Sequence, residues 1–336
     1  MSDNPVGAMI AIDPRIRNGI AQQYNFQIQQ SLPKDLVYKI AYVGNMGRRL
    51  ETSYDFNQVE PGSAAPALRR PLRFVAPNVQ GASYNVSDGL SSYHSLQMSL
   101  ERRFASGIGF LTAYTWAHSI DDVANQFGGG DNGPIPQDRR NRRADRGTSG
   151  HDMRHRFIHS MNYELPVGKG RKLGANMGRA FDLIAGGWDM NMIGALQSGL
   201  PFTPVLNASV SNAGGSRPDR YKVGTIDNPT IAKWFDTSFG TAASGAAWGA
   251  PAVFTFGNGA RNPLYGPGRV NFDFSVFKNF ALTEKFKLQF RTEMFNVFNH
   301  AQFDLPNTAI GSPNAGIITG IVGTPRQMQF ALRLSF

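Results

Sequence analysis

The sequence lacks cysteine, and it lacks any long apolar run. The absence of cysteine among the 336 residues excludes disulfides, thiolate metal sites and cysteine nucleophiles. It also suits a chain that passes through an oxidising periplasm, where a stray thiol is a hazard. No run of about 18 consecutive apolar residues occurs, which excludes a transmembrane helix. Transmembrane β-strands remain compatible with the mean hydropathy of −0.30, because half of their side chains face water.

Two further signals are missing, a leader peptide and a nucleic-acid motif. The first residues, Met1-Ser2-Asp3-Asn4-Pro5, contain neither a basic stretch nor an apolar stretch, so no signal peptide is visible. The formal net charge is +10, but the basic residues are scattered except for a cluster at 139–143. No zinc finger, basic helix or aromatic RNA-binding motif accompanies that cluster, so we expect no nucleic-acid partner.

The strongest positive signal is alternation of apolar and polar residues with period two, which is typical of β-strands. It is clearest at the C-terminus, where one face of a strand would carry Met328, Phe330, Leu332, Leu334 and Phe336. The same pattern recurs eight times, in segments of about the 9–11 residues that a tilted membrane strand requires. The nine expected strands span residues 20–32, 35–45, 94–105, 108–119, 153–165, 187–200, 269–280, 284–296 and 327–336.

The connections between these segments alternate between short and long. Short turns at 33–34, 106–107 and 281–283 separate long connections, whereas the link at 166–186 is of intermediate length. Outer-membrane barrels have short periplasmic turns and long extracellular loops. The fold class predicted is therefore all-β: part of an antiparallel transmembrane β-barrel, with about nine strands of a larger barrel and long extracellular loops. We expect residues 1–19 to form a loop that enters the barrel, and residues 20–336 to form its C-terminal part.

The alternation also predicts which side chains face the membrane. Six apolar residues of the last three strands are expected to face lipid, and four basic residues to face the lumen. The lipid-facing set is Phe274, Phe286, Leu288, Phe290, Phe330 and Leu332, and the lumen-facing set is Lys285, Lys287, Arg291 and Arg333. Tyr163, Trp188 and Phe336 would lie near the periplasmic interface and Trp116 near the outer one, as an aromatic girdle requires.

Several short motifs occur in a characteristic order along the chain. They are Tyr42-Val43-Gly44-Asn45, Arg143-Ala144-Asp145-Arg146-Gly147, Asp152-Met153-Arg154-His155-Arg156-Phe157, Tyr163-Glu164-Leu165-Pro166, Gly186-Gly187-Trp188, Gln197-Ser198-Gly199-Leu200-Pro201-Phe202 and the run from Arg291 to His300. Together they resemble the C-terminal barrel of TonB-dependent receptors of the Oar-like group. In that group the barrel follows a carboxypeptidase-regulatory-like domain and a plug. The chain departs from the group in showing no signal peptide, plug or TonB box, so we expect a C-terminal fragment with strands missing before residue 1.

The resemblance implies uptake of a ligand across the bacterial outer membrane, energised by the TonB system through the missing N-terminal part. The implied partners are outer-membrane lipid and lipopolysaccharide, the barrel assembly machinery and an unidentified small ligand. The terminal strand with Met328, Phe330, Leu332, Leu334 and Phe336 resembles the signal by which that machinery recognises its clients. An ordinary edge strand that ends in phenylalanine is the alternative.

Four arginines are the candidate ligand-binding residues: Arg139, Arg140, Arg142 and Arg143. They would attract anionic ligands or lipopolysaccharide phosphates, whereas the alternative is a solvated loop. His151, His155 and His159 do not predict a metal site, because residues four apart on a strand lie about 13 Å apart. Asp121, Asp122 and Asp131 flank a glycine triplet, but they lack the register of a calcium loop and predict a flexible surface loop.

No nucleophile elbow, paired acid or zinc-protease motif is present, so we expect neither an enzyme nor a cofactor. Three functions remain open. The first is a receptor that imports a metal chelate, saccharide or peptide, and the second is an adhesive or surface-binding barrel. The third is a soluble all-β protein, in which the alternating apolar residues would be buried rather than exposed.

Overall fold

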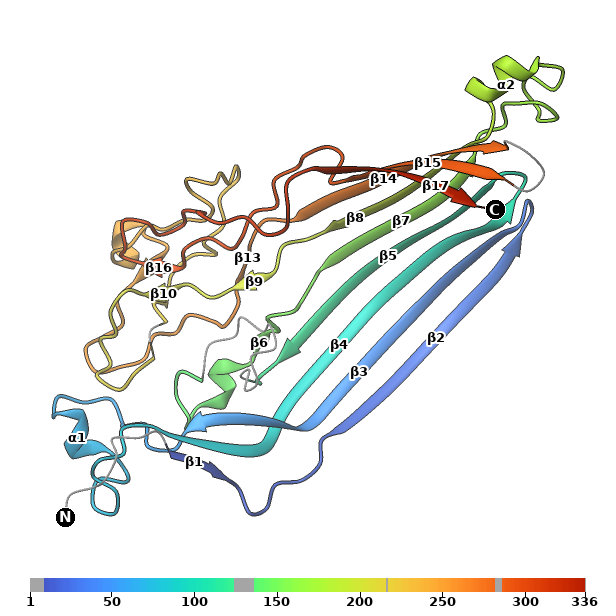
Figure 1. Ribbon diagram of the computed structural model, residues 1–336. Coiled ribbons are helices and arrows are strands. Elements are labelled where there is room, and N and C mark those ends of the chain that lie inside the picture. The colour runs from blue at the N-terminus through green and yellow to red at the C-terminus, as the bar shows by residue number, and fades with distance from the viewer. Residues whose placement is uncertain (1–8, 124–135, 216, 282–285, 336) are drawn as a thin grey trace, which may run out of the picture.

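The computed structural model describes residues 9–123, 136–215, 217–281 and 286–335. Nine long strands follow one another antiparallel in a single sheet, each paired with its neighbour in the sequence (Figure 1). They are β2 (Ile20–Leu32), β3 (Leu36–Asp55), β4 (Ala82–Ala105), β5 (Ile108–Asp121), β7 (His155–Glu164), β8 (Trp188–Gln197), β14 (Arg269–Ala281), β15 (Lys287–Phe295) and β17 (Gln327–Ser335). The nine predicted strands are confirmed, and the two short strands β1 (Met9–Ile12) and β6 (Gly147–Thr148) join the same sheet.

β3 and β4 are far longer than predicted. Their pairing continues past a register shift between Arg48 and Glu51, where Arg49 adopts a positive φ of 55°. Beyond this bulge the rings of Tyr54 and Tyr84 pack edge to face, with centroids 5.7 Å apart. A β-bulge bends its strand without ending the pairing, so the hairpin extends well beyond the span that a membrane requires. The first part of the chain pairs here as well, since β1 runs parallel to the start of β4.

The register of the strands places apolar and polar side chains on opposite faces of the sheet. Phe274 lies beside Met294 and Met294 beside Met328, while Phe290 lies beside Leu332. Five of the six residues predicted to face lipid therefore share one face, and Lys287, Arg291 and Arg333 lie on the other. Phe286 precedes β15 and is exposed, and Lys285 lies outside the described residues.

The apolar face is exposed rather than buried. Phe330 and Leu332 are 65% and 70% exposed, and Phe26 and Trp116 on other strands are also exposed. A soluble all-β protein would bury such a face in its core, whereas a barrel wall presents it to lipid.

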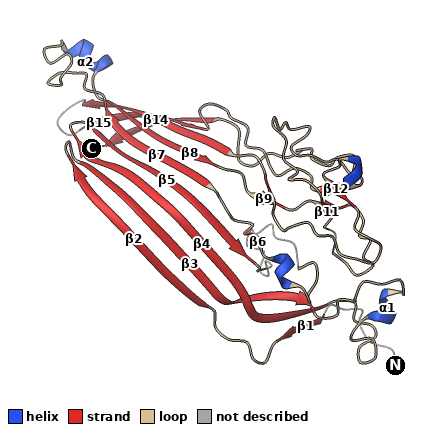
Figure 2. Cartoon of the chain, turned by 180° about the vertical axis from the view of Figure 1, so that it is seen from behind, coloured by secondary structure: helices blue, strands red, loops and turns tan. Residues whose placement is uncertain are grey.

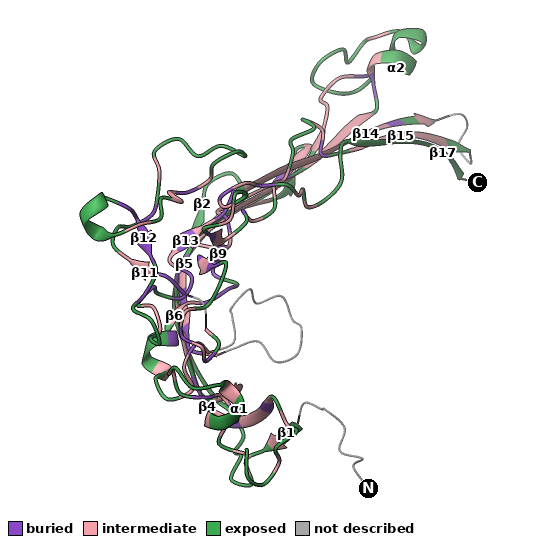
Figure 3. Ribbon diagram, turned by 90° about the vertical axis from the view of Figure 1, so that its left-hand side faces the viewer, coloured by how far each residue is buried: buried purple, intermediate pink, exposed green. Residues whose placement is uncertain are grey.

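The sheet curves but does not close (Figures 2 and 3). Within the described residues, β2 and β17 each have only one neighbour, so each leaves one edge unpaired. In hydrocarbon an unpaired backbone group costs several kcal/mol, and complete barrels have no edges. The observed architecture is therefore that of a partial barrel.

The two ends of the sheet differ. The turns from β2 to β3 and from β4 to β5, the C-terminal end of β17 and helix α2 (Arg179–Ala185) lie at one end, and the long connections lie at the other (Figure 1). Tyr163 and Trp188 lie near the first end, and Trp116 lies toward the second. Neither α2 nor α1 (Pro66–Arg69), the α-helices of the described part, has the length and apolar composition to cross a membrane.

The long connections contain secondary structure of their own. They carry the short strands β9 (Pro201–Phe202), β10 (Val205–Leu206), β11 (Asp219–Arg220), β12 (Trp248–Gly249), β13 (Leu264–Tyr265) and β16 (Ala309–Ile310), and the 3-10 helices η1 (Arg142–Asp145) and η2 (Ala242–Ser244). Pairing of β9 with β13 brings together the two ends of the connection between β8 and β14, and pairing of β10 with β16 joins that connection to the one between β15 and β17. The hydrophobic core of the molecule lies here, around Phe202, Phe235, Ala247, Trp248, Leu264 and Ile310 (Figure 3).

Candidate functional site

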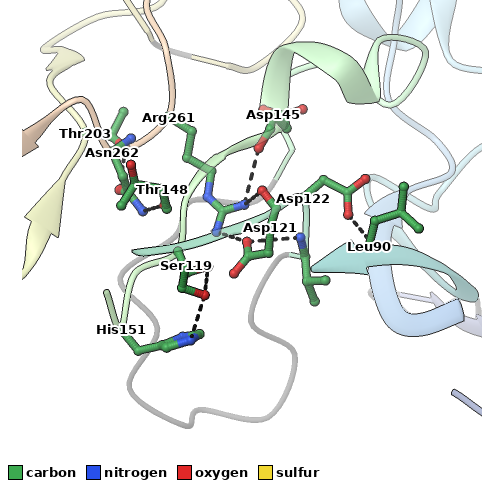
Figure 4. A network of polar contacts seen from close by, with 12 residues as sticks. Leu90, Ser119, Asp121, Asp122, Asp145, Thr148, His151, Thr203, Arg261 and Asn262 are labelled. Carbon is green, nitrogen blue, oxygen red and sulfur yellow. Dashed lines mark hydrogen bonds and ion pairs between the residues drawn. The ribbon is translucent and has the colours of Figure 1, made fainter. Parts of the chain in front are cut away.

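Buried ion pairs join two connections, β5–β7 and β8–β14, at the extracellular end of β5, and Figure 4 shows the part of this network around Arg261. Arg217 Nη2 lies 2.8 Å from Asp145 Oδ1. Arg261 pairs with Asp121 and donates hydrogen bonds of 3.2 Å to the backbone carbonyls of Asp121 and Asp145. All four side chains are buried. Since a buried charge must be paired, these contacts fix the connections relative to one another.

Burial sets the electrostatics of the Arg217–Asp145 pair. Desolvation raises the pKa of the Asp145 carboxyl, against the attraction of Arg217. Desolvation also lowers the pKa of the Arg217 guanidinium, against the attraction of Asp145. Each charge is therefore tolerated mainly because its partner is present.

Asp152 is the centre of a second polar cluster, which also involves the end of β5. Its carboxylate accepts hydrogen bonds from the Ser119 backbone N–H, at 2.6 Å, and from the Tyr265 hydroxyl, at 2.9 Å. The same carboxylate lies 3.5 Å from His118 Nδ1. Asp152 is buried and links the end of β5 to β13, so its position in the sequence motif has a structural role.

Between these two clusters, the backbone at Gly147 lies close to the backbone at Arg261. Asn262 donates its side-chain amide to the Thr148 carbonyl, at 2.8 Å, and accepts a hydrogen bond from the Thr203 hydroxyl (Figure 4). A Cβ atom at Gly147 would lie 2.5 Å from the Arg261 carbonyl oxygen. Glycine is therefore required here for the segment around Arg261 to reach β6.

Four arginines line a surface hollow of about 510 Å³ beside this network: Arg143, Arg146, Arg220 and Arg261. No acidic residue is among the described residues that line it. Arg143 and Arg146 are exposed. Arg220 is held in place by hydrogen bonds to the carbonyls of Lys222 and Val223. Guanidinium groups bind carboxylate and phosphate oxygens in pairs, so the hollow has the chemistry of an anion site.

The arginines predicted from sequence do not act as one group. Arg142 forms ion pairs with Asp88 and Asp122. Arg140 pairs with Glu60 and Asp138, and the guanidinium of Arg139 lies over the ring of Phe56. Arg143 alone of the four lines the hollow.

Of the other arginines that line the hollow, Arg220 and Arg261 were not predicted from the sequence. Arg146 follows the predicted cluster closely enough to be included in it. Arg220 and Arg261 carry no local signal, because tertiary structure brings them to the hollow.

The prediction of a flexible surface loop is wrong for two of its three aspartates. Asp121 and Asp122 are buried at the end of β5, and Asp122 accepts a hydrogen bond from the Leu90 N–H, so they do not belong to a flexible surface loop. The loop prediction failed because a neighbouring strand and Arg261 supply their partners. Asp131 and the glycine triplet lie outside the described residues.

In each of the three histidines considered as metal ligands, one ring nitrogen lies near a side-chain hydroxyl group. His155 and His159 lie on β7, within 2.7 Å of the Tyr114 hydroxyl and 2.8 Å of the Thr112 hydroxyl, respectively. His151 Nε2 lies 3.4 Å from Ser119 Oγ. In the part of the chain that the structure describes, no three His, Asp or Glu side chains are grouped to hold a metal ion.

The predicted assembly signal lies at the open edge of the sheet. Met328, Phe330, Leu332 and Leu334 are exposed along β17, the last strand of the order. Phe336 lies outside the described residues.

Among solved structures, an outer-membrane transporter shares this fold, and two further outer-membrane proteins match with lower scores. The outer membrane transporter YddB from Escherichia coli matches with a TM-score of 0.50 at 10% identity, over 96% of this chain and 33% of its own. BauA, the ferric preacinetobactin receptor from Acinetobacter baumannii, matches with a TM-score of 0.42 at 11% identity, over 94% of this chain and 29% of its own. The FrpB iron transporter from Neisseria meningitidis matches with a TM-score of 0.43 at 9% identity, over 97% and 32%. The chain thus spans about a third of the length of these proteins.

No curated protein matches the chain. A family model described as an outer membrane beta barrel domain matches residues 2–329, which is nearly the whole sequence. The open antiparallel sheet, its exposed apolar face and its folded extracellular connections agree with that match. The chain belongs to the outer membrane beta barrel domain family and is a protein of the bacterial outer membrane.

Proposed function

We propose that the chain is the C-terminal barrel part of a TonB-dependent receptor that binds an anionic ligand in its extracellular loops and takes it up. The observation that carries the proposal is the hollow lined by Arg143, Arg146, Arg220 and Arg261. Its volume of about 510 Å³ is in the range of small-molecule sites. Plug and TonB contacts would come from parts of the receptor outside this chain, as the Oar-like resemblance implies.

Buried ion pairs beside the hollow hold its wall in place, so an anion would bind to a rigid site. Arg261 is fixed by Asp121, and Arg217 is fixed by Asp145. A preorganised site loses little conformational entropy when the ligand binds. The net charge of +10 would also attract anions from a distance. Carboxylate-bearing metal chelates, phosphorylated compounds and lipopolysaccharide phosphates share the required chemistry.

Removing the exposed arginines of the hollow should weaken anion binding. We expect Arg143→Ala and Arg146→Ala each to raise the dissociation constant at least about tenfold, because a hydrogen bond to a charged group contributes about 1.5–3 kcal/mol. Arg140→Ala is the matched control, since it removes the same charge from the same connection but lies outside the hollow. The measurement is calorimetric titration with citrate, ferric citrate, inorganic phosphate, lipid A and a neutral trisaccharide. Failure of every anion to bind, or equal losses for all three variants, would contradict the proposal.

An adhesive barrel is the second candidate. The folded connections expose Val223, Ile231 and Val253, and exposed apolar residues are common where proteins associate. Adhesion would persist in Arg143→Ala and would be lost when Val253 and Ile231 are replaced by serine. Uptake of a labelled anion would show the opposite dependence.

The unpaired edge of β17 leads to a prediction about how the barrel assembles in the outer membrane. We expect deletion of Phe336 to lower the amount of folded protein in the outer membrane, because β17 must pair at its open edge before the barrel is closed. Molecules that do fold should bind anions as the wild type does. Outer-membrane abundance and affinity per molecule would be measured together, with Ser335→Ala as the control. Unchanged abundance with lost affinity would instead assign the terminus to a ligand site.

A further inference from the structure

We propose that the segment 166–187, which includes α2, is a membrane-surface anchor that binds anionic phospholipid headgroups at the short-turn end of the barrel. The apolar side of α2 would dip into the leaflet, and the basic residues of the segment would contact lipid phosphates. This inference does not depend on the ligand of the extracellular hollow.

The segment exposes more apolar surface than a connecting turn requires. Phe181 and Ile184 of α2 are 72% and 75% exposed, and Leu173 and Leu183 are exposed as well. Residues three apart in a helix lie on the same face, so Phe181 and Ile184 form one apolar side. This side is covered by nothing in the described part of the chain.

Two side chains of the lipid-facing surface hold the end of α2. Trp188 Nε1 donates a 2.9 Å hydrogen bond to the Ile184 carbonyl. Lys278 Nζ donates to the Gly186 carbonyl and lies 5.3 Å from the ring of Trp188. The register places Lys278 beside Trp188 on one side and Phe290 on the other, so both anchors belong to the apolar face of the sheet.

The position of the segment follows from these contacts. α2 lies at the end of the sheet with the short turns, and its C-terminal carbonyls are bonded from the lipid-facing side (Figure 1). These bonds place the C-terminal end of α2 on the lipid-facing side of the sheet. At the level of Trp188 that side reaches the headgroup region, where tryptophan is enriched in membrane proteins.

The charges of the segment complement an anionic headgroup layer. Lys169, Arg171, Lys172 and Arg179 are all exposed. The carboxylate of Asp182 instead accepts a 2.6 Å hydrogen bond from the Lys169 N–H, within the segment. Apolar and basic residues together in a short exposed element are typical of segments that lie in a membrane interface. A protein partner or plug would be an alternative cover for the apolar side, but the attachment of α2 to the lipid-facing side of the sheet favours lipid.

The absence of cysteine allows a direct test. The variant Ile184→Cys, labelled with an environment-sensitive fluorophore, would be reconstituted in vesicles of phosphatidylethanolamine and phosphatidylglycerol. Asn176→Cys is the matched control, in the same segment and also exposed. We expect lipids with a shallow spin label to quench the fluorophore at position 184 at least twofold more than that at position 176, and aqueous iodide to show the reverse.

The contribution of the basic residues to lipid binding is tested in the same assay. Lys169→Gln with Lys172→Gln should reduce lipid quenching at position 184 by about half in anionic vesicles and leave it unchanged in phosphatidylcholine. Equal iodide quenching at positions 184 and 176 would overturn the proposal, because α2 would then lie in water. Blue-shifted emission without lipid quenching would also overturn it, since the apolar side would then be covered by protein.

Discussion

Arginine in place of Leu332 is expected to destabilise the folded barrel by about 2–4 kcal/mol, the cost of a basic side chain at the middle of a lipid-facing strand. Leu332 is 70% exposed near the centre of β17 and pairs with Phe290 on the apolar face. The charge would enter hydrocarbon with no acidic neighbour on that face of β15, where Leu288, Phe290, Thr292 and Met294 lie.

The control for this variant is Gln329→Arg on the opposite face of the same strand. Gln329 pairs with Glu293, so an arginine there would meet a carboxylate on the polar side of the wall. We expect its free energy of unfolding to stay within about 1 kcal/mol of wild type, as for other exposed ion pairs. Guanidinium titration of the protein in lipid vesicles measures both values. Equal stability of the two variants would show that the faces have been assigned wrongly.

Alanine in place of Asp145 is expected to destabilise the extracellular connections by about 3–5 kcal/mol, because the Arg217 charge would be left buried without a partner. The two side chains are paired at 2.8 Å and both are buried. Asp138→Ala removes a carboxylate from the same connection but breaks only the more exposed pair with Arg140. That control should cost less than about 1 kcal/mol.

The double variant Asp145→Leu with Arg217→Met tests whether the stability lost in Asp145→Ala comes from the unpaired charge or from lost packing. Replacing a buried ion pair by apolar residues of similar size is often neutral, so this variant should recover most of the stability lost in Asp145→Ala. Limited proteolysis of intact outer membranes measures opening of the connections, and resistance of the barrel to heated detergent shows that the wall is still folded. An Asp145→Ala protein as resistant to protease as wild type would mean that the network does not hold the connections together.

The strands of the wall could be predicted because alternation is a local property of the sequence. The positions of Phe330 and Leu332 relative to Arg333 follow from their spacing alone, whatever the neighbouring strand is. The order of short and long connections likewise indicated the orientation of the two ends. The extension of β3 and β4 could not be predicted in this way, since it depends on pairing across the bulge at Arg49.

By itself the sequence determined the nine strands, their two faces and the class of protein, because a barrel wall needs only period two and turns of the right length. Only the tertiary structure decided the folded connections and the candidate site. Asp121 and Arg261 are 140 residues apart, and Phe202 and Trp248 of one connection share a core with Ile310 of another. Contacts between residues so far apart produce no periodic pattern in the sequence from which they could be predicted. Arg143 could be singled out in its basic cluster, but Arg220 and Arg261 reach the hollow only because buried ion pairs and an apolar core fix the path of the chain.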